Sequence, residues 1–414
     1  MIGQSVIGLF VFVVFSWIIS EDRRKARFRP VIAGLSLQLA IAAFFLKVPV
    51  FKDLFLLMNK GIIFLEEAAG VGTAFVFGYL GGGDLPFDEK VPGAGYILAF
   101  RALPLVLVIS AISSLLFYWR VLPYIVRMFS WMLQKTMGIG GAEGVGVAAN
   151  IFTGMIEAPI FIRPYLKDME RSELFTVMTC GMATIAGTVM ALYAAVLSRV
   201  VPDITGHILT ASIISAPAAV TVSKLMVPGG NRLTKGSLIP DQAAQSSMDA
   251  ISRGTIDGVK LIINIIAMLI VLIALVYIVN GILGILPDFG GSPVTLQRIL
   301  GYIMAPVVWL MGIPWAETLA AGSVMGTKTV LNEFIAYIEL ANLPESVISQ
   351  KSRLILVYAL CGFANFGSLG IMIGGLGSMV PERKQEILSL GVKSIIAGTI
   401  STCMTGAVVG ILTG

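Results

Sequence analysis

The stretch Asn150-Ile-Phe-Thr-Gly-Met-Ile-Glu-Ala-Pro159 places one carboxylate inside a long apolar region, between a glycine and a proline. An ionisable group in the hydrocarbon of a bilayer costs at least about 2.5–3.5 kcal/mol on insertion scales, so it persists only with a partner, a cavity or a function. Pro159 removes a backbone donor and Gly154 permits an unusual turn, which frees backbone groups for water, ions or a ligand. The stretch predicts a broken helix with a binding role for Glu157. The alternative is that Glu157 pairs with Arg163 inside the protein.

The composition indicates an integral membrane protein. The chain has 414 residues, of which 57% are hydrophobic and 13% are charged, with a net charge of +5. A soluble domain carries about 25% charged residues. The excess of basic residues is typical of cytoplasmic loops that set topology, and we do not expect nucleic acid as a partner.

The sequence contains none of the short motifs that would indicate an enzyme or an ATP-driven pump, such as HExxH, GxSxG, Walker A or CxxC. It has a single histidine, His207, and its three cysteines show no paired or metal-binding spacing. We therefore expect a protein that is not an enzyme.

About 20 apolar residues span a bilayer as a helix. Eight segments meet that length, and a basic cluster after the first places its end in the cytoplasm, so both termini are expected outside. Two further apolar regions, 121–166 and 296–340, are interrupted by Gly, Pro and acidic residues and predict re-entrant hairpins, while the mixed segment 59–80 suggests an interfacial helix. The expected spans are 2–20, 31–50, 98–118, 174–200, 207–227, 259–286, 353–380 and 387–413.

The polar stretch 228–258 reads as a cytoplasmic linker between two blocks of similar plan. Each block has a hairpin region with a late acidic residue, then a span with a Gly-rich polar break, then another span. Repeats with interrupted helices are the signature of secondary transporters. The predicted division of the chain is 1–97, 98–120, 121–227, 228–258, 259–290 and 291–414.

The second block repeats the polar pattern of the first. Glu333 lies beside Asn332, and Lys328 is close enough in sequence for an ion pair, which is the alternative to a binding role. Asn365 and Ser368 lie three residues apart at the second break. Small polar groups of this type suit a polyhydroxylated ligand such as a sugar, although they also hold membrane helices together.

At these motifs the chain resembles the concentrative nucleoside transporter family, in its bacterial, eight-helix form. The resemblance is most specific at four segments, and covers nearly the whole chain. It implies an all-α polytopic membrane protein with eight transmembrane helices, two re-entrant hairpins, an interfacial helix and an inverted pseudo-repeat. It also implies a homotrimer in the lipid of a bacterial inner membrane, with an elevator-type transport domain moving against a scaffold that includes 98–118 and 259–286. The four segments are Gly154-Met-Ile-Glu-Ala-Pro159, Asn332-Glu-Phe-Ile-Ala-Tyr337, Cys361-Gly-Phe-Ala-Asn-Phe-Gly-Ser368, and Gly374-Gly-Leu-Gly-Ser378 with Ile396-Ala-Gly-Thr399 after it.

The resemblance also assigns roles to individual residues. Ribose hydroxyls would bind Glu333, Asn365 and Ser368. The base side would be formed by Met155, Ile156, Glu157, Val189 and Phe363. Sodium would bind the side chains of Asn150 and Thr184 and the carbonyls of Thr153 and Ile185.

One departure from the family pattern concerns the first hairpin tip, which in nucleoside carriers usually reads Gly-Gln-Ser/Thr-Glu. This chain has Met155 and Ile156 where the family has hydrogen-bonding residues. We therefore expect sodium-coupled nucleoside uptake with altered or relaxed base preference. Two alternatives stay open, which are proton coupling on the same fold, and a nucleoside sensor or substrate-gated channel without net transport.

Overall fold

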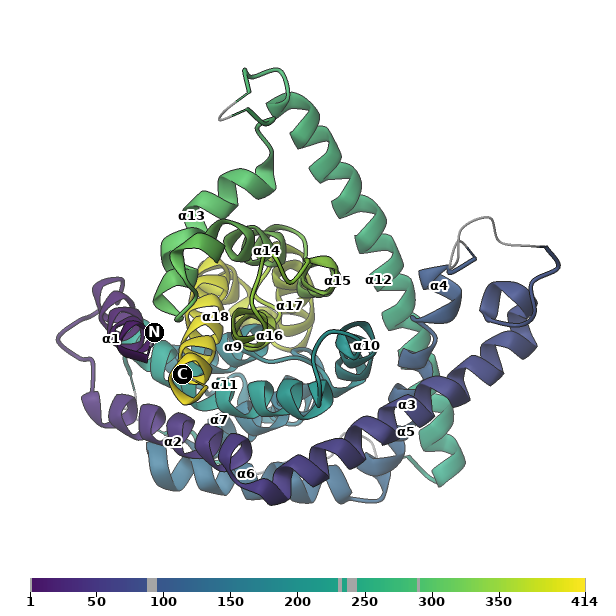
Figure 1. Ribbon diagram of the computed structural model, residues 1–414. Coiled ribbons are helices and arrows are strands. Elements are labelled where there is room, and N and C mark those ends of the chain that lie inside the picture. The colour runs from purple at the N-terminus through teal and green to yellow at the C-terminus, as the bar shows by residue number, and fades with distance from the viewer. Residues whose placement is uncertain (1, 88–94, 230–232, 237–243, 289–290, 414) are drawn as a thin grey trace.

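The computed structural model describes residues 2–87, 95–229, 233–236, 244–288 and 291–413, and this part of the chain is helical without a β-strand (Figure 1). The predicted linker 228–258 lies partly outside the described residues. The helices are α1 (Ile2–Ile18), α2 (Phe28–Lys47), α3 (Pro49–Phe77), α4 (Leu98–Arg101), α5 (Leu105–Tyr118), α6 (Val121–Met137), α7 (Gly141–Asn150), α8 (Glu157–Ile160), α9 (Arg171–Ala183), α10 (Gly187–Leu197), α11 (Ile204–Met226), α12 (Ser247–Leu283), α13 (Leu296–Leu310), α14 (Thr318–Val330), α15 (Glu333–Asn342), α16 (Gln350–Leu360), α17 (Phe366–Met379) and α18 (Lys384–Leu412), with short 3₁₀ turns at Gly78–Gly81, Arg163–Tyr165, Trp315–Glu317 and Pro381–Arg383.

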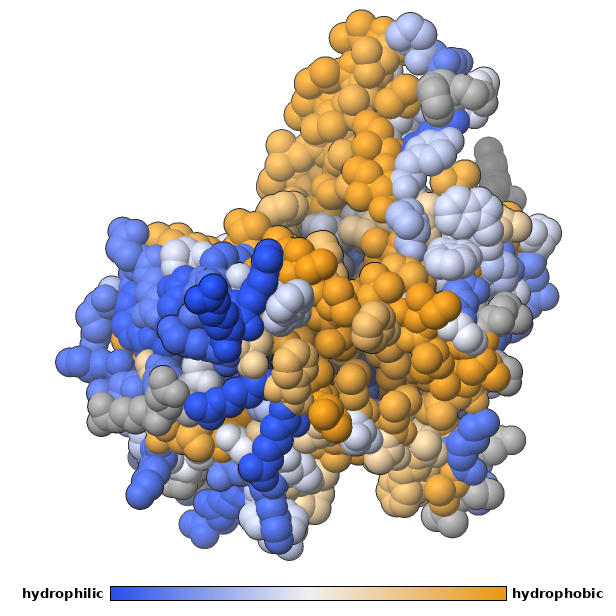
Figure 2. Space-filling view, turned by 90° about the vertical axis from the view of Figure 1, so that its left-hand side faces the viewer, coloured by the Kyte–Doolittle hydropathy of each residue, from blue (hydrophilic) through white to orange (hydrophobic). Residues whose placement is uncertain are grey.

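The molecule has the surface of a multi-pass membrane protein. Seven helical segments of the described chain are long and apolar enough to cross a bilayer. Figure 2 shows hydrophobic side chains forming a broad continuous area, with hydrophilic side chains gathered at its margins. Phe75 on α3 is 92% exposed and Tyr277 on α12 is 80% exposed. Apolar exposure on this scale suits lipid or another membrane chain, so the predicted all-α polytopic class is confirmed.

The centre of the fold is formed by α11 and α18, which pack against each other and against α9 and α16. In the most apolar part of α11, 94% of the residues are buried inside the protein, whereas in the most apolar part of α12 only 11% are buried. α12 instead pairs with α5 and runs along the side of the molecule (Figure 1). α1 packs on α18, which brings the two chain ends together.

Two pairs of short helices form hairpins beside this centre. In each, the chain leaves the first helix, turns, and starts the second helix at a glutamate: α7 leads to α8 at Glu157, and α14 leads to α15 at Glu333. Each hairpin is followed by a helix interrupted in the middle, α9–α10 and α16–α17, and then by a long helix. The order of elements from α6 to α11 is thus repeated from α13 to α18.

Several helices begin or end at residues other than those expected from the sequence. The regions 121–166 and 296–340 each contain a separate helix, α6 or α13, before the hairpin itself. The segment 59–80 belongs to the longer α3, which qualifies by length and hydropathy as a span, so its interfacial placement stays a prediction. α12 begins at Ser247 rather than at 259, because Ser246 caps the helix by accepting the Asp249 N–H at 3.1 Å.

Candidate functional site

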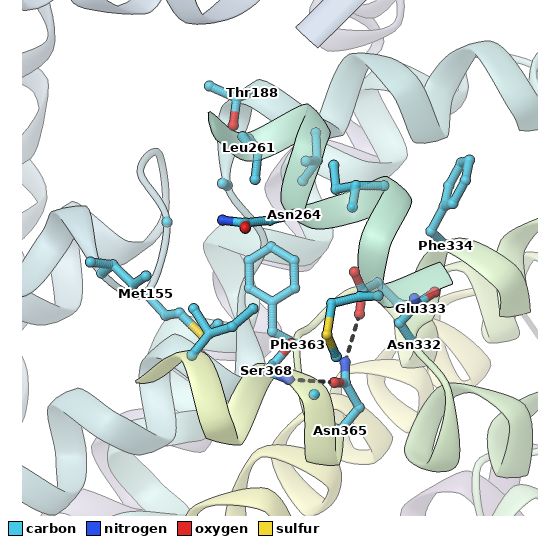
Figure 3. A pocket seen from close by; sticks show the side chains of 18 of the residues that line it. Met155, Thr188, Leu261, Asn264, Asn332, Glu333, Phe334, Phe363, Asn365 and Ser368 are labelled. Atoms are coloured by element: carbon cyan, nitrogen blue, oxygen red, sulfur yellow. Dashed lines mark hydrogen bonds between the residues drawn. The ribbon is translucent and has the colours of Figure 1, made fainter. Parts of the chain in front are cut away.

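A pocket lies where both hairpin tips and both interrupted helices face α12. The cavity has a volume of about 180 Å³ and opens at a mouth on one side. All three predicted ribose ligands and all five predicted base-side residues line it (Figure 3). Residues far apart in sequence are therefore collected around one cavity.

Glu333 is held in this pocket by two donors from different helices. The Tyr193 hydroxyl on α10 donates to Glu333 Oε1 at 2.6 Å, and Asn365 Nδ2 donates to Glu333 Oε2 at 3.0 Å. Asn365 is also the cap of α17, because its Oδ1 accepts the Ser368 N–H at 2.7 Å. The cap orients the amide, and the amide in turn orients the carboxylate, whose remaining lone pairs can accept hydroxyl groups.

Lys328 does not form the ion pair with Glu333 that was the alternative reading of this cluster. Its ammonium donates to the Ala359 carbonyl at 2.8 Å and to Thr402 Oγ1 at 3.0 Å. Ala359 belongs to α16 and Thr402 to α18. Lys328 is fully buried in the last turn of α14, and Asn150 is buried in the last turn of α7.

Glu157 starts α8 and its side chain is exposed toward the pocket. No ion pair joins it to Arg163 or to another residue of the described chain. A Cβ at Gly154 would overlap Glu157 Oε2, so the glycine is what allows the carboxylate to fold back over the tip. Glu157 is thus placed by the turn rather than by a basic partner.

The two residues that depart from the family pattern are packed within the protein. Met155 is 8% exposed, and its Cβ would be 2.8 Å from a Cβ at Gly181 on α9. Ile156 packs on α17, where a Cβ at Gly375 would lie 3.2 Å from its Cγ2. The tip therefore offers the pocket an apolar surface beside Glu157.

The four predicted sodium-binding residues surround the first hairpin tip and the break between α9 and α10. Gly187 N donates to the Phe152 carbonyl at 3.0 Å and so ties the break to the tip. Asn150 Nδ2 donates to the Gly146 carbonyl at 2.9 Å, whereas Asn150 Oδ1 is buried without a hydrogen-bond partner in the described chain. A buried acceptor left unpaired is costly, so a cation in this place would be stabilising.

Of that set, Thr184 was predicted to bind through its side chain and Thr153 through its carbonyl, and the hydroxyls of both threonines point to carbonyls of the helix that precedes each. Thr153 Oγ1 donates to the Ala149 carbonyl at 2.9 Å, and Thr184 Oγ1 donates to the Cys180 carbonyl at 2.8 Å. With each proton directed to a carbonyl, the oxygen lone pairs stay available. Ile185 lies in the non-helical break, where its backbone is outside the helical hydrogen-bond ladder. These oxygen donors fit a hard monovalent cation.

Sequence reasoning gave no site role to four polar residues that line the pocket, Thr188, Tyr193, Asn264 and Asn332. Nothing in the apolar segment 174–200 distinguishes Tyr193, whose partner Glu333 is 140 residues away. Asn264 could have been found, because it is a polar side chain in the most hydrophobic span of the chain.

A surface cluster ties the loop between α1 and α2 to two central helices. Glu21 accepts from Arg171 NH2 at 2.9 Å on α9 and from Lys393 Nζ at 2.5 Å on α18. The hydrogen bond from Arg171, together with Lys393, lowers the pKa of Glu21 to about 2. The cluster joins segments distant in sequence at one end of the molecule.

Comparison with known proteins agrees with this architecture. Three family models match: the sodium-dependent nucleoside transporter C-terminus over residues 207–410, its N-terminus over 7–80, and a nucleoside-recognition gate over 99–199. The nucleoside permease NupC of Helicobacter pylori is 33% identical over 99% of this chain and 97% of its own length. An uncharacterized transporter of Haemophilus influenzae is 36% identical over 99% of this chain and 98% of its own.

The likeness extends to human and solved proteins. Human solute carrier family 28 member 3 is 34% identical over 98% of this chain, which spans 59% of that protein. The structure of CNTnw in an inward-facing substrate-bound state has a TM-score of 0.90 and 34% identity, covering 100% of this chain and 98% of that one. The chain belongs to the sodium-dependent, concentrative nucleoside transporter family and is a multi-pass membrane transporter, not an enzyme.

Proposed function

We propose that this protein couples the entry of sodium to the uptake of nucleosides across the bacterial inner membrane, with both termini outside. The main support for the proposal is the hydrogen bond of 3.0 Å from Asn365 Nδ2 to Glu333 Oε2. It lies in a pocket that the first hairpin tip also lines. Secondary transporters bind their substrate where interrupted helices meet, near the middle of the membrane.

In this proposal Glu333, Asn365 and Ser368 bind the ribose. Glu333 can accept two hydroxyl protons while Tyr193 and Asn365 fix its plane. The α17 N-terminus, which begins at Phe366, adds backbone donors at the same end of the pocket. The base would lie toward Glu157, Val189 and Phe363, against the apolar surface of Met155 and Ile156. Base preference would then differ from that of relatives with a hydrogen-bonding tip.

Sodium would be bound by Asn150, Thr153, Thr184 and Ile185, and the buried unpaired Asn150 Oδ1 supports this assignment. The bound ion would supply positive charge that holds the first hairpin tip against the α9–α10 break. Coupling requires that the ion favour the conformation that binds substrate. Because the tip carries Glu157 into the pocket, ordering the tip would favour nucleoside binding.

The movement proposed is of the elevator type, within a homotrimer. The interrupted helices pack around α11 and α18, and the hairpins lie beside them. α12 and α5 pair with each other apart from that centre (Figure 1). The exposed apolar face of α12 supports a role as scaffold toward lipid and neighbouring subunits. The two hairpins would be re-entrant and would move with the substrate.

Purified protein in proteoliposomes tests the proposal. An inward sodium gradient should drive labelled nucleoside above its external concentration, and replacing sodium with choline should abolish accumulation. If a pH gradient drives accumulation in choline, coupling is to protons and the sodium assignment is wrong. If the internal concentration never exceeds the external one under either gradient, the protein is a channel or sensor and not a carrier.

A further inference from the structure

We propose that Asn264, on α12, is the residue that reads the hydrogen-bonding edge of the nucleobase. The inference rests on the proposed nucleoside transport and names how the same pocket recognises its substrate. It would replace the recognition that the apolar first hairpin tip cannot provide.

The placement of Asn264 singles it out. Five residues of α12 line the pocket from one helical face, and all of them except Asn264 are apolar. They are Leu261, Asn264, Ile265, Met268 and Leu272. A polar side chain in a membrane span is retained where it faces a cavity or a partner. Asn264 therefore faces the pocket for a reason other than hydrophobic packing.

Asn280 provides a comparison within the same helix. Its Nδ2 donates to Gln297 Oε1 at 3.1 Å, and its Oδ1 accepts the Leu296 N–H at 2.8 Å, so the whole amide holds the α12–α13 connection together. Asn264 is exposed, and within the described chain its amide has no hydrogen-bond partner. The Asn280 amide is structural, whereas the Asn264 amide is free for a ligand.

The direction of the side chain indicates which part of the ligand it meets. In Figure 3 the Asn264 amide lies over Phe363 and points toward the Met155 side of the pocket, away from Glu333. Glu333 and Asn365, the proposed ribose anchors, occupy the opposite side. The group that reaches Asn264 is therefore the base.

The chemistry of a carboxamide defines the class of base. It presents one donor beside one acceptor, the pattern with which Asn pairs with adenine. Since the amide can turn by 180° about its terminal bond, it accepts either order of donor and acceptor. Bases with an exocyclic amino or carbonyl group next to a ring nitrogen satisfy it, whether purine or pyrimidine. A base without the exocyclic group can bond to only one of the two polar groups of the Asn264 amide, and the other group is left without a partner.

The test compares ligands that differ only at this edge. Inhibition of labelled nucleoside uptake is measured for adenosine against purine riboside, and for cytidine against pyrimidin-2-one riboside. Each second compound lacks the exocyclic amino group. The wild type should discriminate at least one pair by about tenfold, which equals about 1.4 kcal/mol. In Asn264→Leu that ratio should fall to about twofold or less.

Two controls separate recognition from damage. Ile270→Leu alters the same helix at a side chain 65% exposed away from the pocket and should keep the wild-type ratio. Asn264→Leu should still prefer adenosine over 3′-deoxyadenosine, because the ribose site is untouched.

The outcomes divide cleanly. If Asn264→Leu keeps the wild-type edge ratio, or if the wild type discriminates neither pair, Asn264 does not read the base, while nucleoside transport stands. If the wild type never accumulates a nucleoside, the proposed function fails and this inference fails with it.

Discussion

Tyr193 and Glu333, 140 residues apart, are joined by a hydrogen bond of 2.6 Å from the phenol to Oε1. The bond links α10, the second half of the first interrupted helix, to the first residue of α15 in the second hairpin. The two repeated halves of the chain therefore meet at a carboxylate that lines the pocket.

Replacing Tyr193 with Phe should weaken nucleoside binding by about tenfold, because a hydrogen bond to a charged group contributes about 1.5–3 kcal/mol and its loss frees the carboxylate to reorient. The concentration of nucleoside that half-inhibits labelled uptake is the measurement. Tyr337→Phe is the matched control, since Tyr337 packs on Tyr193 with ring centroids 5.1 Å apart but donates to the Val357 carbonyl. Equal affinities in wild type and Tyr193→Phe would refute a positioning role.

Removing the unpaired Asn150 acceptor should raise the sodium concentration needed for half-maximal uptake by tenfold or more, about 1.4 kcal/mol. Uptake is measured in Asn150→Ala across a sodium series at fixed nucleoside. Asn59→Ala removes an amide of the same size, whose Oδ1 accepts from Thr205 at 3.0 Å away from the tip, and should keep the wild-type response. An unchanged sodium response in Asn150→Ala would contradict the assignment of Asn150 as a sodium ligand.

Gly154→Ala should impair nucleoside binding without unfolding the protein, because the new Cβ displaces the Glu157 carboxylate. A loss of about tenfold in apparent affinity is expected from a misplaced hydrogen-bonding group. Gly370→Ala on α17 is the control, since nothing lies within 4 Å of its Cβ position. If both variants bind nucleoside equally well, the turn does not position Glu157 for the ligand.

The Glu21 cluster predicts a dependence of stability on pH. The folded pKa of Glu21 is about 2, below the ordinary 4.5, so its stabilisation is complete above about pH 4.5 and is lost as the pH falls toward 2. Glu21→Gln should lower the thermal unfolding temperature at pH 7, at a cost of about 1 kcal/mol. The difference from wild type should shrink in acid. A difference that is constant from pH 7 to pH 3 would contradict this origin.

The sequence predicted the parts of the site that interrupt an apolar pattern. Glu157, Glu333 and the break at Asn365 could be found because carboxylates, glycine and proline are conspicuous in a membrane segment. Their collection around one pocket followed from the family resemblance, and the structure places them there. Their roles in binding stay predictions that the experiments above address.

The contacts that orient these residues could not be predicted from the chain. Lys328, five residues before Glu333, instead donates to Ala359 on α16 and Thr402 on α18, which spacing alone does not reveal. Tyr193 resembles any other aromatic residue of an apolar helix until the fold brings Glu333 to it. Helix boundaries shifted for a local reason, as at Ser246, where one capping hydroxyl extends α12 into a polar segment.

The buried ammonium of Lys328 has a further consequence under the proposed sodium assignment. In the second half of the molecule, the Lys328 ammonium lies in the last turn of α14, the first helix of the second hairpin. It donates to the Ala359 carbonyl near the end of α16. In the first half, the last turn of α7 carries Asn150 instead of a lysine, and Asn150 Oδ1 is unpaired within the described chain. The second repeat therefore has a permanent positive charge from Lys328, whereas the first repeat would obtain one only when sodium binds from solution. Under that assignment, the first repeat would be the half of the molecule that responds to the sodium gradient.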